Sequence, residues 1–267
     1  MSPSRPRGKR AAEAPSASVP AAAVGAAANG APTAPAEERP RRALGIFAHP
    51  DDAEFLCGGT VAKLCAAGWE VRYIIATSGD KGTKDPALTP AMLADIRERE
   101  QSAAAAVLGV KECLYLRLPD GFVEEDVALR GQIVRLLRRY RPDSVITWDG
   151  FRPGFNHRDH RNVGRATYDA LFPAVRDPLY YADDIADGLL AHKVGEILLA
   201  GSDRPDYFVD CADFQETKAR AIYCHTSQIQ AKPWDEFLKD YLKGGREGGR
   251  RSGTPFTEAF RRVTMRT

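Results

Sequence analysis

Short apolar runs alternate with longer helical patterns through the middle of the chain, and this alternation constrains the fold more than any other feature. The runs rich in β-forming residues lie at 44–48, 71–77, 113–118 and 144–148. The helical patterns between them lie at 58–67, 90–108 and 129–140. Strands joined through helices of this length favour right-handed crossovers between parallel neighbours. The alternation therefore predicts an α/β protein built on a parallel sheet.

Polar side chains directly follow all four predicted strands. They are His49, Asp51 and Asp52 after the first strand, Ser78 and Asp80 after the second, Asp120 after the third, and Asp149 and His157 after the fourth. The carboxyl ends of parallel strands lie at one edge of the sheet, where α/β proteins of this kind bind their ligands. We therefore expect these side chains to gather around one site.

The start of the chain has a different composition. Half of residues 1–40 are Ala or Pro, and none is aromatic, Ile or Leu. Such a segment buries too little apolar area to offset its ordering entropy. We therefore predict a disordered tail at 1–42 and a folded domain at 43–267. A secretory signal is the competing interpretation, although Pro15 and Pro20 break up the apolar stretch that it would need.

The last third of the chain carries weaker signals. Its composition predicts two strands and a helix, at 197–200, 207–209 and 214–224 respectively. The segment 243–253 is rich in Gly and Arg, and such a composition disfavours regular structure. We predict a mobile loop there.

Charge and cysteine content narrow the class of protein. The net charge of +2 comes entirely from residues 1–40, and a neutral body lacks the basic face that a nucleic-acid binder needs. No apolar stretch approaches 18 residues, so we expect no membrane partner. The five cysteines are odd in number and form no C-x-x-C pair, which favours a reducing compartment. We therefore expect a cytoplasmic location.

Two short motifs carry the chemistry. The first is Ala48-His49-Pro50-Asp51-Asp52, directly after the first strand, and the second runs from Asn156 to His160. Imidazole and carboxylate groups suit Zn²⁺, and a hydrolytic site needs three such ligands with one open position for water. The alternative is that both motifs are plain loops, in which an Asp caps the following helix and the second motif is solvated. Their common position at predicted strand ends favours the metal site.

These motifs give the chain a resemblance to the LmbE-like, or PIG-L, family of zinc-dependent N-acetylglucosamine deacetylases. The A-H-P-D-D signature at 48–52 and the H-x-D-H signature at 157–160 are its hallmarks. Further family-like pieces follow in order: Gly58-Gly59-Thr60, Thr77 to Gly82, Arg97 with Glu100, Pro119-Asp120-Gly121, and His225 to Gln228. The resemblance covers about 44–260. It implies a single three-layer α/β/α domain of Rossmann-like topology with a mostly parallel sheet.

The resemblance also implies roles for individual residues. His49, Asp52 and His160 are the expected zinc ligands, although such a site also suits Fe²⁺. Asp51 is the expected general base, which takes a proton from the zinc-activated water. His157 is expected to stabilise the oxyanion or to protonate the leaving amine.

Three further residues complete the expected site. The resemblance implies that Asp159 pairs with His157 and keeps that imidazole protonated and oriented. Arg97 and Asp120 match positions that contact substrate in relatives. Arg97 has the alternative of an ion pair on its own helix, with Glu98 or Glu100. His225 and Trp148 have either a pocket-lining or a structural role.

The expected activity is removal of an N-acetyl group from a small molecule that contains an amino sugar, such as a glycoside. One alternative is an amidase that cleaves thiol-conjugate amides at the same site. Another is a non-enzymic sugar-binding module, which the intact set of expected ligands and base disfavours. A dehydrogenase is disfavoured because the first predicted strand is followed by His-Pro-Asp-Asp and not by G-x-G-x-x-G. The chain could also form a homo-oligomer.

Overall fold

The computed structural model describes residues 39–248 and 255–265. The predicted tail lies outside the described residues up to Glu38, and β1 begins at Arg42. The three residues between them belong to the folded unit. Arg39 forms an ion pair with Asp143 at 2.8 Å, and the guanidinium of Arg41 lies 4.1 Å from the ring centroid of Trp69.

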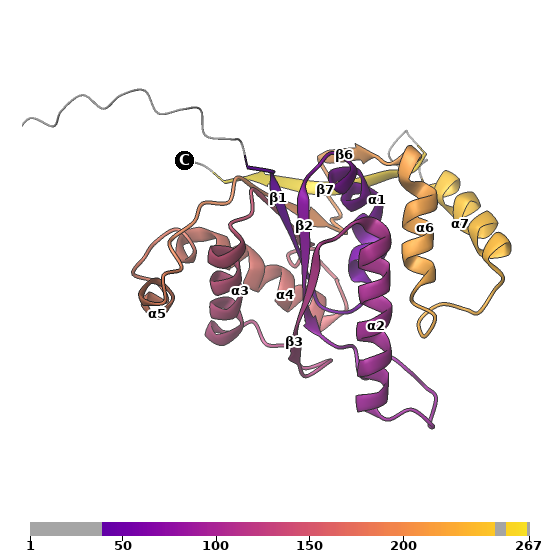
Figure 1. Ribbon diagram of the computed structural model, residues 1–267, viewed down its shortest axis with the longest axis horizontal. Helices are drawn as coiled ribbons and strands as arrows, with labels where there is room; N and C mark the ends of the chain where they lie inside the picture. The colour runs from indigo at the N-terminus through magenta and orange to yellow at the C-terminus, as the bar shows by residue number, and fades with distance from the viewer. Residues whose placement is uncertain (1–38, 249–254, 266–267) are drawn as a thin grey trace, which may run out of the picture. The chain divides into compact units, whose positions relative to one another are not determined.

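Helices cover both faces of a seven-stranded sheet (Figure 1). The strands are β1 Arg42–Phe47, β2 Glu70–Thr77, β3 Glu112–Leu118, β4 Ser144–Trp148, β5 Glu196–Ala200, β6 Tyr207–Asp210 and β7 Thr257–Thr264. The helices are α1 Asp52–Ala66, α2 Pro90–Leu108, α3 Val127–Tyr140, α4 Arg158–Asp169, α5 Ala182–Ala186, α6 Gln215–Tyr223 and α7 Trp234–Gly248. The predicted three-layer α/β/α fold with a mostly parallel sheet is confirmed.

The strand order is β3-β2-β1-β4-β5-β7-β6, and β1 to β5 are mutually parallel along it. The chain runs outward from β1 to β3, then crosses back through α3 to place β4 on the other side of β1. Such a reversal opens a crevice at the carboxyl ends of the two central strands. Here those strands end at Phe47 and Trp148, so both motifs lie at the crevice.

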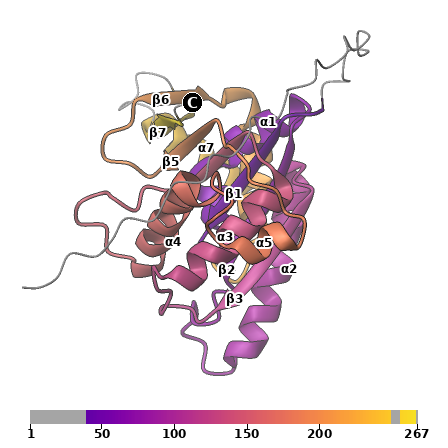
Figure 2. The same cartoon turned by 90° about the vertical axis from the view of Figure 1, so that its left-hand side faces the viewer.

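The core consists of two apolar layers, one on each face of the sheet. Alternating residues of β1 separate between them: Leu44 and Ile46 belong to the layer under α3 and α4, whereas Ala43 and Phe47 belong to the layer under α1 and α2. Figure 2 turns the α3, α4 and α5 side toward the reader. Because both faces of the sheet are covered at β1 and β4, these strands are mostly apolar rather than alternating.

Helix α2 follows its sequence signals closely. It spans Pro90–Leu108, the side chain of Thr89 accepts from the Met92 N–H at its start, and Gly109 ends it in the left-handed region with φ of 84°. These are the cap residues that the sequence offers. Helix α1 instead begins earlier than predicted, at Asp52, and has a break in its helical geometry at Cys57.

The prediction was wrong for part of the last third. Residues 243–248 belong to α7 rather than to a loop, while 249–253 lie outside the described residues. Helix α7 packs on α6 through an aromatic cluster of Tyr223, Trp234, Phe237 and Tyr241. Strand β7 was not predicted. It pairs antiparallel with both β5 and β6, and such a long-range partner leaves no local signal in the sequence.

Candidate active site

The first motif forms a tight turn between β1 and α1. One carboxylate oxygen of Asp52, Oδ2, accepts from the backbone N–H groups of Ala48 at 3.1 Å and His49 at 2.9 Å. The same oxygen accepts from the indole Nε1 of Trp148 at 2.9 Å. These three donors occupy Oδ2 and leave Oδ1 of Asp52 directed at the crevice. Asp52 is therefore fixed in place with one oxygen available as a ligand.

The second motif brings an imidazole to this oxygen from 108 residues further along the chain. His160 lies in the first turn of α4, and its Nε2 is 3.1 Å from Asp52 Oδ1 and 3.0 Å from His49 Nδ1. His49 Nδ1 lies 3.8 Å from the other Asp52 oxygen. The three predicted metal ligands thus converge. A tetrahedral ion with bonds of about 2.0–2.2 Å would separate its ligand atoms by about 3.3–3.6 Å, a spacing close to the observed one.

The other nitrogen of His49 faces two carboxylates. Nε2 lies 3.1 Å from Asp120 Oδ1 and 3.2 Å from Asp159 Oδ2. Since an ionised carboxylate only accepts hydrogen bonds, Nε2 carries a proton, and Nδ1 is the ring nitrogen that faces His160. Burial alone would lower the pKa of His49, but the hydrogen bonds to Asp120 and Asp159 raise it to about 10. The surroundings of His49 therefore stabilise a positive charge.

Beside the predicted trio, two other groups among the described residues bring ligand atoms close enough to hold a metal ion, and both contain His49 but not Asp52. One adds His157 and His160, and the other adds Asp120 and Asp159. The two carboxylates already accept from backbone N–H groups: Asp159 from Gly121 at 2.7 Å and Val123 at 3.1 Å, and Asp120 from Lys81 at 2.9 Å. They act as hydrogen-bond partners of His49 Nε2, which leaves Nδ1 as the ring nitrogen that faces His160 and Asp52.

The expected pairing of Asp159 with His157 is wrong. Asp159 is fully buried and directs its oxygens at His49, Gly121 and Val123. His157 is exposed instead, at the N-cap position of α4. Although the residue is exposed, partial burial of its ring, together with the neighbouring His160 and His49, lowers the pKa of His157. The described contacts of His157 include no carboxylate that pairs with its ring, and the residue lies at the open side of the site.

Asp51 lies beside the ligand cluster and is held by Arg97. The guanidinium Nη2 is 3.1 Å from Asp51 Oδ2 and also donates to the Pro50 carbonyl, while Nη1 donates to the Gly79 carbonyl. Burial and the neighbouring Asp52 raise the pKa of Asp51 to about 7, against the effect of Arg97, which lowers it. A carboxylate with a pKa near neutrality suits a general base.

Both residues expected to contact substrate have their polar atoms directed at the protein. Arg97 is 4% exposed and makes no surface ion pair with Glu98 or Glu100. Asp120 is 7% exposed, with one oxygen on His49 and the other on the Lys81 N–H. Their described contacts hold Asp51 and His49.

Aromatic stacking holds His160 in place. Its ring lies between Trp148, at 4.1 Å between centroids and 15° between planes, and His157, at 4.3 Å and 22°. Its Nδ1 has no hydrogen-bond partner among the described residues, so stacking orients the ring. Trp148 thus contacts two predicted ligands, His160 by its face and Asp52 by its N–H. Its place at the end of β4 was the signal in the sequence for this role.

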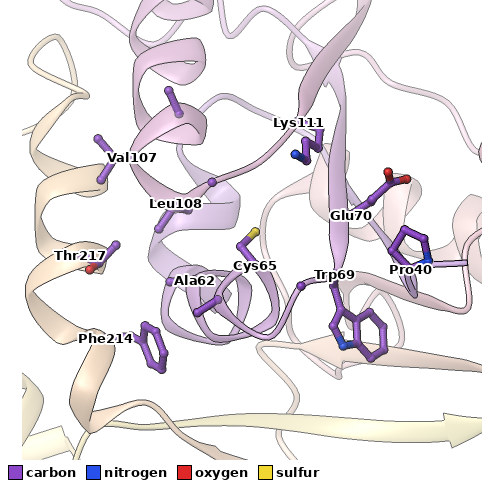
Figure 3. A pocket seen from close by; sticks show the side chains of 14 residues that line it. Pro40, Ala62, Cys65, Trp69, Glu70, Val107, Leu108, Lys111, Phe214 and Thr217 are labelled. Carbon is purple, nitrogen blue, oxygen red and sulfur yellow. The ribbon is translucent and has the colours of Figure 1, made fainter.

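A large cavity lies away from the candidate site, so cavity volume alone does not identify the site. A cavity of about 610 Å³ lies at the amino ends of β2 and β3, and Figure 3 shows Cys65, Trp69 and Lys111 among its lining side chains. Its lining contains none of the predicted site residues.

In the described part of the chain, no helix is long and apolar enough to cross a bilayer.

Fold and site together define a doubly wound α/β protein in which two histidines and a carboxylate converge at the carboxyl ends of the central strands. A family model described as "PIG-L: GlcNAc-PI de-N-acetylase" matches residues 44–171. The chain is 33% identical to diacetylchitobiose deacetylase of Thermococcus kodakarensis over 84% of its own length and 83% of that protein. The chain therefore belongs to the PIG-L (LmbE-like) family.

Two further relatives widen the comparison. The structure of N,N'-diacetylchitobiose deacetylase from Pyrococcus horikoshii, complexed with an inhibitor, superposes with a TM-score of 0.77 at 31% identity, covering 85% of each chain. The 1D-myo-inositol 2-acetamido-2-deoxy-alpha-D-glucopyranoside deacetylase of a Mycobacterium species is 29% identical over 72% of this chain and 75% of that protein. The substrates in the names of these relatives each contain an acetylated amino sugar, and they differ in what is attached to it.

Proposed function

We propose that the protein is a zinc-dependent hydrolase that removes the N-acetyl group from a small molecule containing N-acetylglucosamine. The observation that carries the proposal is the convergence of His49 Nδ1, His160 Nε2 and Asp52 Oδ1 beside the carboxylate of Asp51. The relatives named as deacetylases of 2-acetamido sugars support the choice of substrate.

The proposed zinc ligands are His49, Asp52 and His160. Their nitrogen and oxygen donors suit Zn²⁺, and the three leave a position open, as in hydrolytic rather than structural sites. The bound ion supplies Lewis-acid chemistry, since it polarises the acetyl carbonyl and eases the deprotonation of water. Asp120 and Asp159 orient His49 through Nε2, which is the usual arrangement around a metal-ligating histidine.

The remaining groups handle protons and charge. Arg97 holds Oδ2 of Asp51, so Oδ1 is free to accept a proton from the attacking water. His157, at the exposed side, donates a hydrogen bond to the carbonyl oxygen as negative charge develops there. The proton collected by Asp51 then passes to the leaving amine. The balanced reaction consumes one water and one amide and releases acetate and the free amino sugar.

The test is a hydrolysis assay on purified, zinc-loaded protein. The panel contains N-acetylglucosamine, N,N'-diacetylchitobiose and N-acetylglucosaminyl-inositol, with release of primary amine and of acetate measured in parallel. We expect equal amounts of both products from at least one sugar, and none from protein stripped of metal. Absence of amine release from every sugar would contradict the proposal, and cleavage of a thiol-conjugate amide alone would favour the amidase alternative.

A further inference from the structure

Asp51 has a backbone conformation that its side chain disfavours. Its φ is 96° and its ψ is −26°, in the left-handed region. An L residue with a Cβ adopts this region rarely, and it persists where surrounding contacts impose it. The conformation turns the chain between β1 and α1. Something in the protein must therefore hold the peptide group of Asp51.

The contact that holds it comes from α2. The backbone N–H of Asp51 donates to Oε1 of Gln101 at 2.8 Å. Gln101 is fully buried and lies one helical turn beyond Arg97, which holds the Asp51 side chain from the same helix. Two residues of α2 therefore hold Asp51: Arg97 binds its carboxylate, and Gln101 accepts from its backbone N–H.

Two more buried groups fix which way the Gln101 amide points. Nε2 of Gln101 donates to Oε1 of Glu54 at 3.0 Å, and Oε2 of Glu54 lies 3.3 Å from Nε2 of His225. Glu54 and His225 are both fully buried. Since the Glu54 carboxylate accepts only, the amide nitrogen must face it, and the amide oxygen must then face Asp51. The reverse orientation would set the Gln101 amide nitrogen against the Asp51 N–H, two donors, and its oxygen against the Glu54 carboxylate, two acceptors.

We propose that Gln101 is a positioning residue that, supported by Glu54 and His225, holds the Asp51 backbone in its left-handed conformation. It thereby places the proposed general base beside the proposed metal ligands. This inference rests on the proposed function, in which Asp51 takes the proton from water. None of these three residues touches the reacting atoms, so they act only through the position of Asp51. A misplaced catalytic group slows the chemical step more than it weakens substrate binding.

The first test needs no activity. Amide hydrogen exchange is measured by NMR on the full chain, without metal and with zinc, for wild type and Gln101→Met. We expect the Asp51 amide to exchange at least about tenfold faster in the variant, while amides within α1 and α2 keep their rates. Gln132→Met is the matched control, because Gln132 is an exposed helical glutamine on α3. An unchanged rate at Asp51 would overturn the proposal.

The second test exchanges the partners. Gln101→Glu alone sets two carboxylates against each other. Glu54→Gln alone is milder, because the new amide can turn its oxygen to Gln101 and its nitrogen to the His225 ring. The double variant restores every hydrogen bond: residue 101 accepts from Asp51 and from the new amide at 54, which accepts from His225.

We expect Gln101→Glu to lower kcat about tenfold to a hundredfold with KM and zinc content unchanged, Glu54→Gln to lower it less, and the double variant to recover most of the loss caused by Gln101→Glu. A double variant no better than Gln101→Glu would contradict the proposed role. If the wild type hydrolyses no acetyl amide, the proposed function fails, and the exchange experiment still tests how Asp51 is held.

Discussion

Two clusters of buried charge lie against helix α1, and they differ in whether their charges balance. At one, Lys218 and Glu258 pair at 2.6 Å. At the other, four carboxylates lie around His49 and His160: Asp51, Asp52, Asp120 and Asp159. Among the described residues, Arg97 is the only Lys or Arg side chain paired with any of these four. A cluster with surplus carboxylates has room for a cation, and a balanced pair has none.

The balanced pair, Lys218 and Glu258, supplies hydrogen bonds to the backbone on either side of the break in α1. Glu258 accepts from the N–H groups of Gly59 at 2.9 Å and Thr60 at 2.7 Å, and Lys218 donates to the carbonyl of Phe55 at 3.0 Å. Burial alone would lower the pKa of Lys218, but Glu258 outweighs it and the pKa is raised. Every charge here has its partner, so the pair serves structure. The comparison teaches that burial of charge alone does not distinguish the two clusters, whereas the balance of Lys and Arg against carboxylates does.

The largest effect should follow from removing a proposed ligand. Asp52→Asn keeps an oxygen for the three N–H donors at Oδ2 but replaces the ligand oxygen by an amide nitrogen. We expect the variant to bind no zinc, to have no activity above metal-free protein, and to lose the stabilisation that zinc gives wild type, about 4 kcal/mol at a thousandfold excess over Kd. Metal analysis and melting curves with and without zinc check this. One equivalent of zinc in the variant would show that Asp52 is not a ligand.

Asp51→Asn should separate chemistry from metal binding. The amide cannot take a proton, so we expect kcat to fall about 10²–10⁴-fold while one zinc per chain is retained. Steady-state kinetics on the best sugar of the panel, with zinc content measured on the same sample, gives the answer. Normal turnover would assign the base to another group.

Breaking the Lys218–Glu258 pair should lower the stability of the fold and leave zinc binding and activity unchanged. Lys218→Met leaves Glu258 buried without its cation, and we expect a loss of about 3–5 kcal/mol in the free energy of unfolding. Zinc content and kcat should be retained. The control is Arg220→Met on the same helix, which removes an exposed ion pair with Glu216 and should cost less than about 1 kcal/mol. Loss of zinc from the Lys218 variant would mean that the two clusters are not independent.

The sequence predicted that His49, Asp52 and His160 lie together, but it did not predict all the partners of the residues around them. Strand β4 and helix α2 have the predicted bounds, because local signals such as the Thr89 cap specify them. Helix α4 lacked such a signal, since the His157 side chain at its N-cap makes no capping hydrogen bond.

The direction of Asp159 was also beyond prediction from sequence. The backbone N–H groups of Gly121 and Val123 set it, and they come from a loop far away in the sequence. Likewise, β7 completes the sheet by pairing with distant strands, and α7 continues through Gly residues because its aromatic face packs on α6. Tertiary contacts outweighed local propensity in each case.

The smallest effect concerns Trp148, which lies at the edge of the unbalanced cluster. Trp148→Phe keeps a ring to stack on His160 but removes the N–H that Asp52 Oδ2 accepts. With one donor fewer, Oδ2 competes with Oδ1 for the ion and the carboxylate is less firmly oriented. We expect zinc affinity to fall about 10–100-fold, measured by competition with a chelator, with kcat at saturating zinc within about threefold of wild type. Trp234→Phe, in the α6–α7 aromatic cluster, is the matched control and should bind zinc as wild type does. Equal affinities in the two variants would mean that ring stacking alone maintains the ligand geometry, and that the indole N–H contributes nothing to the metal site.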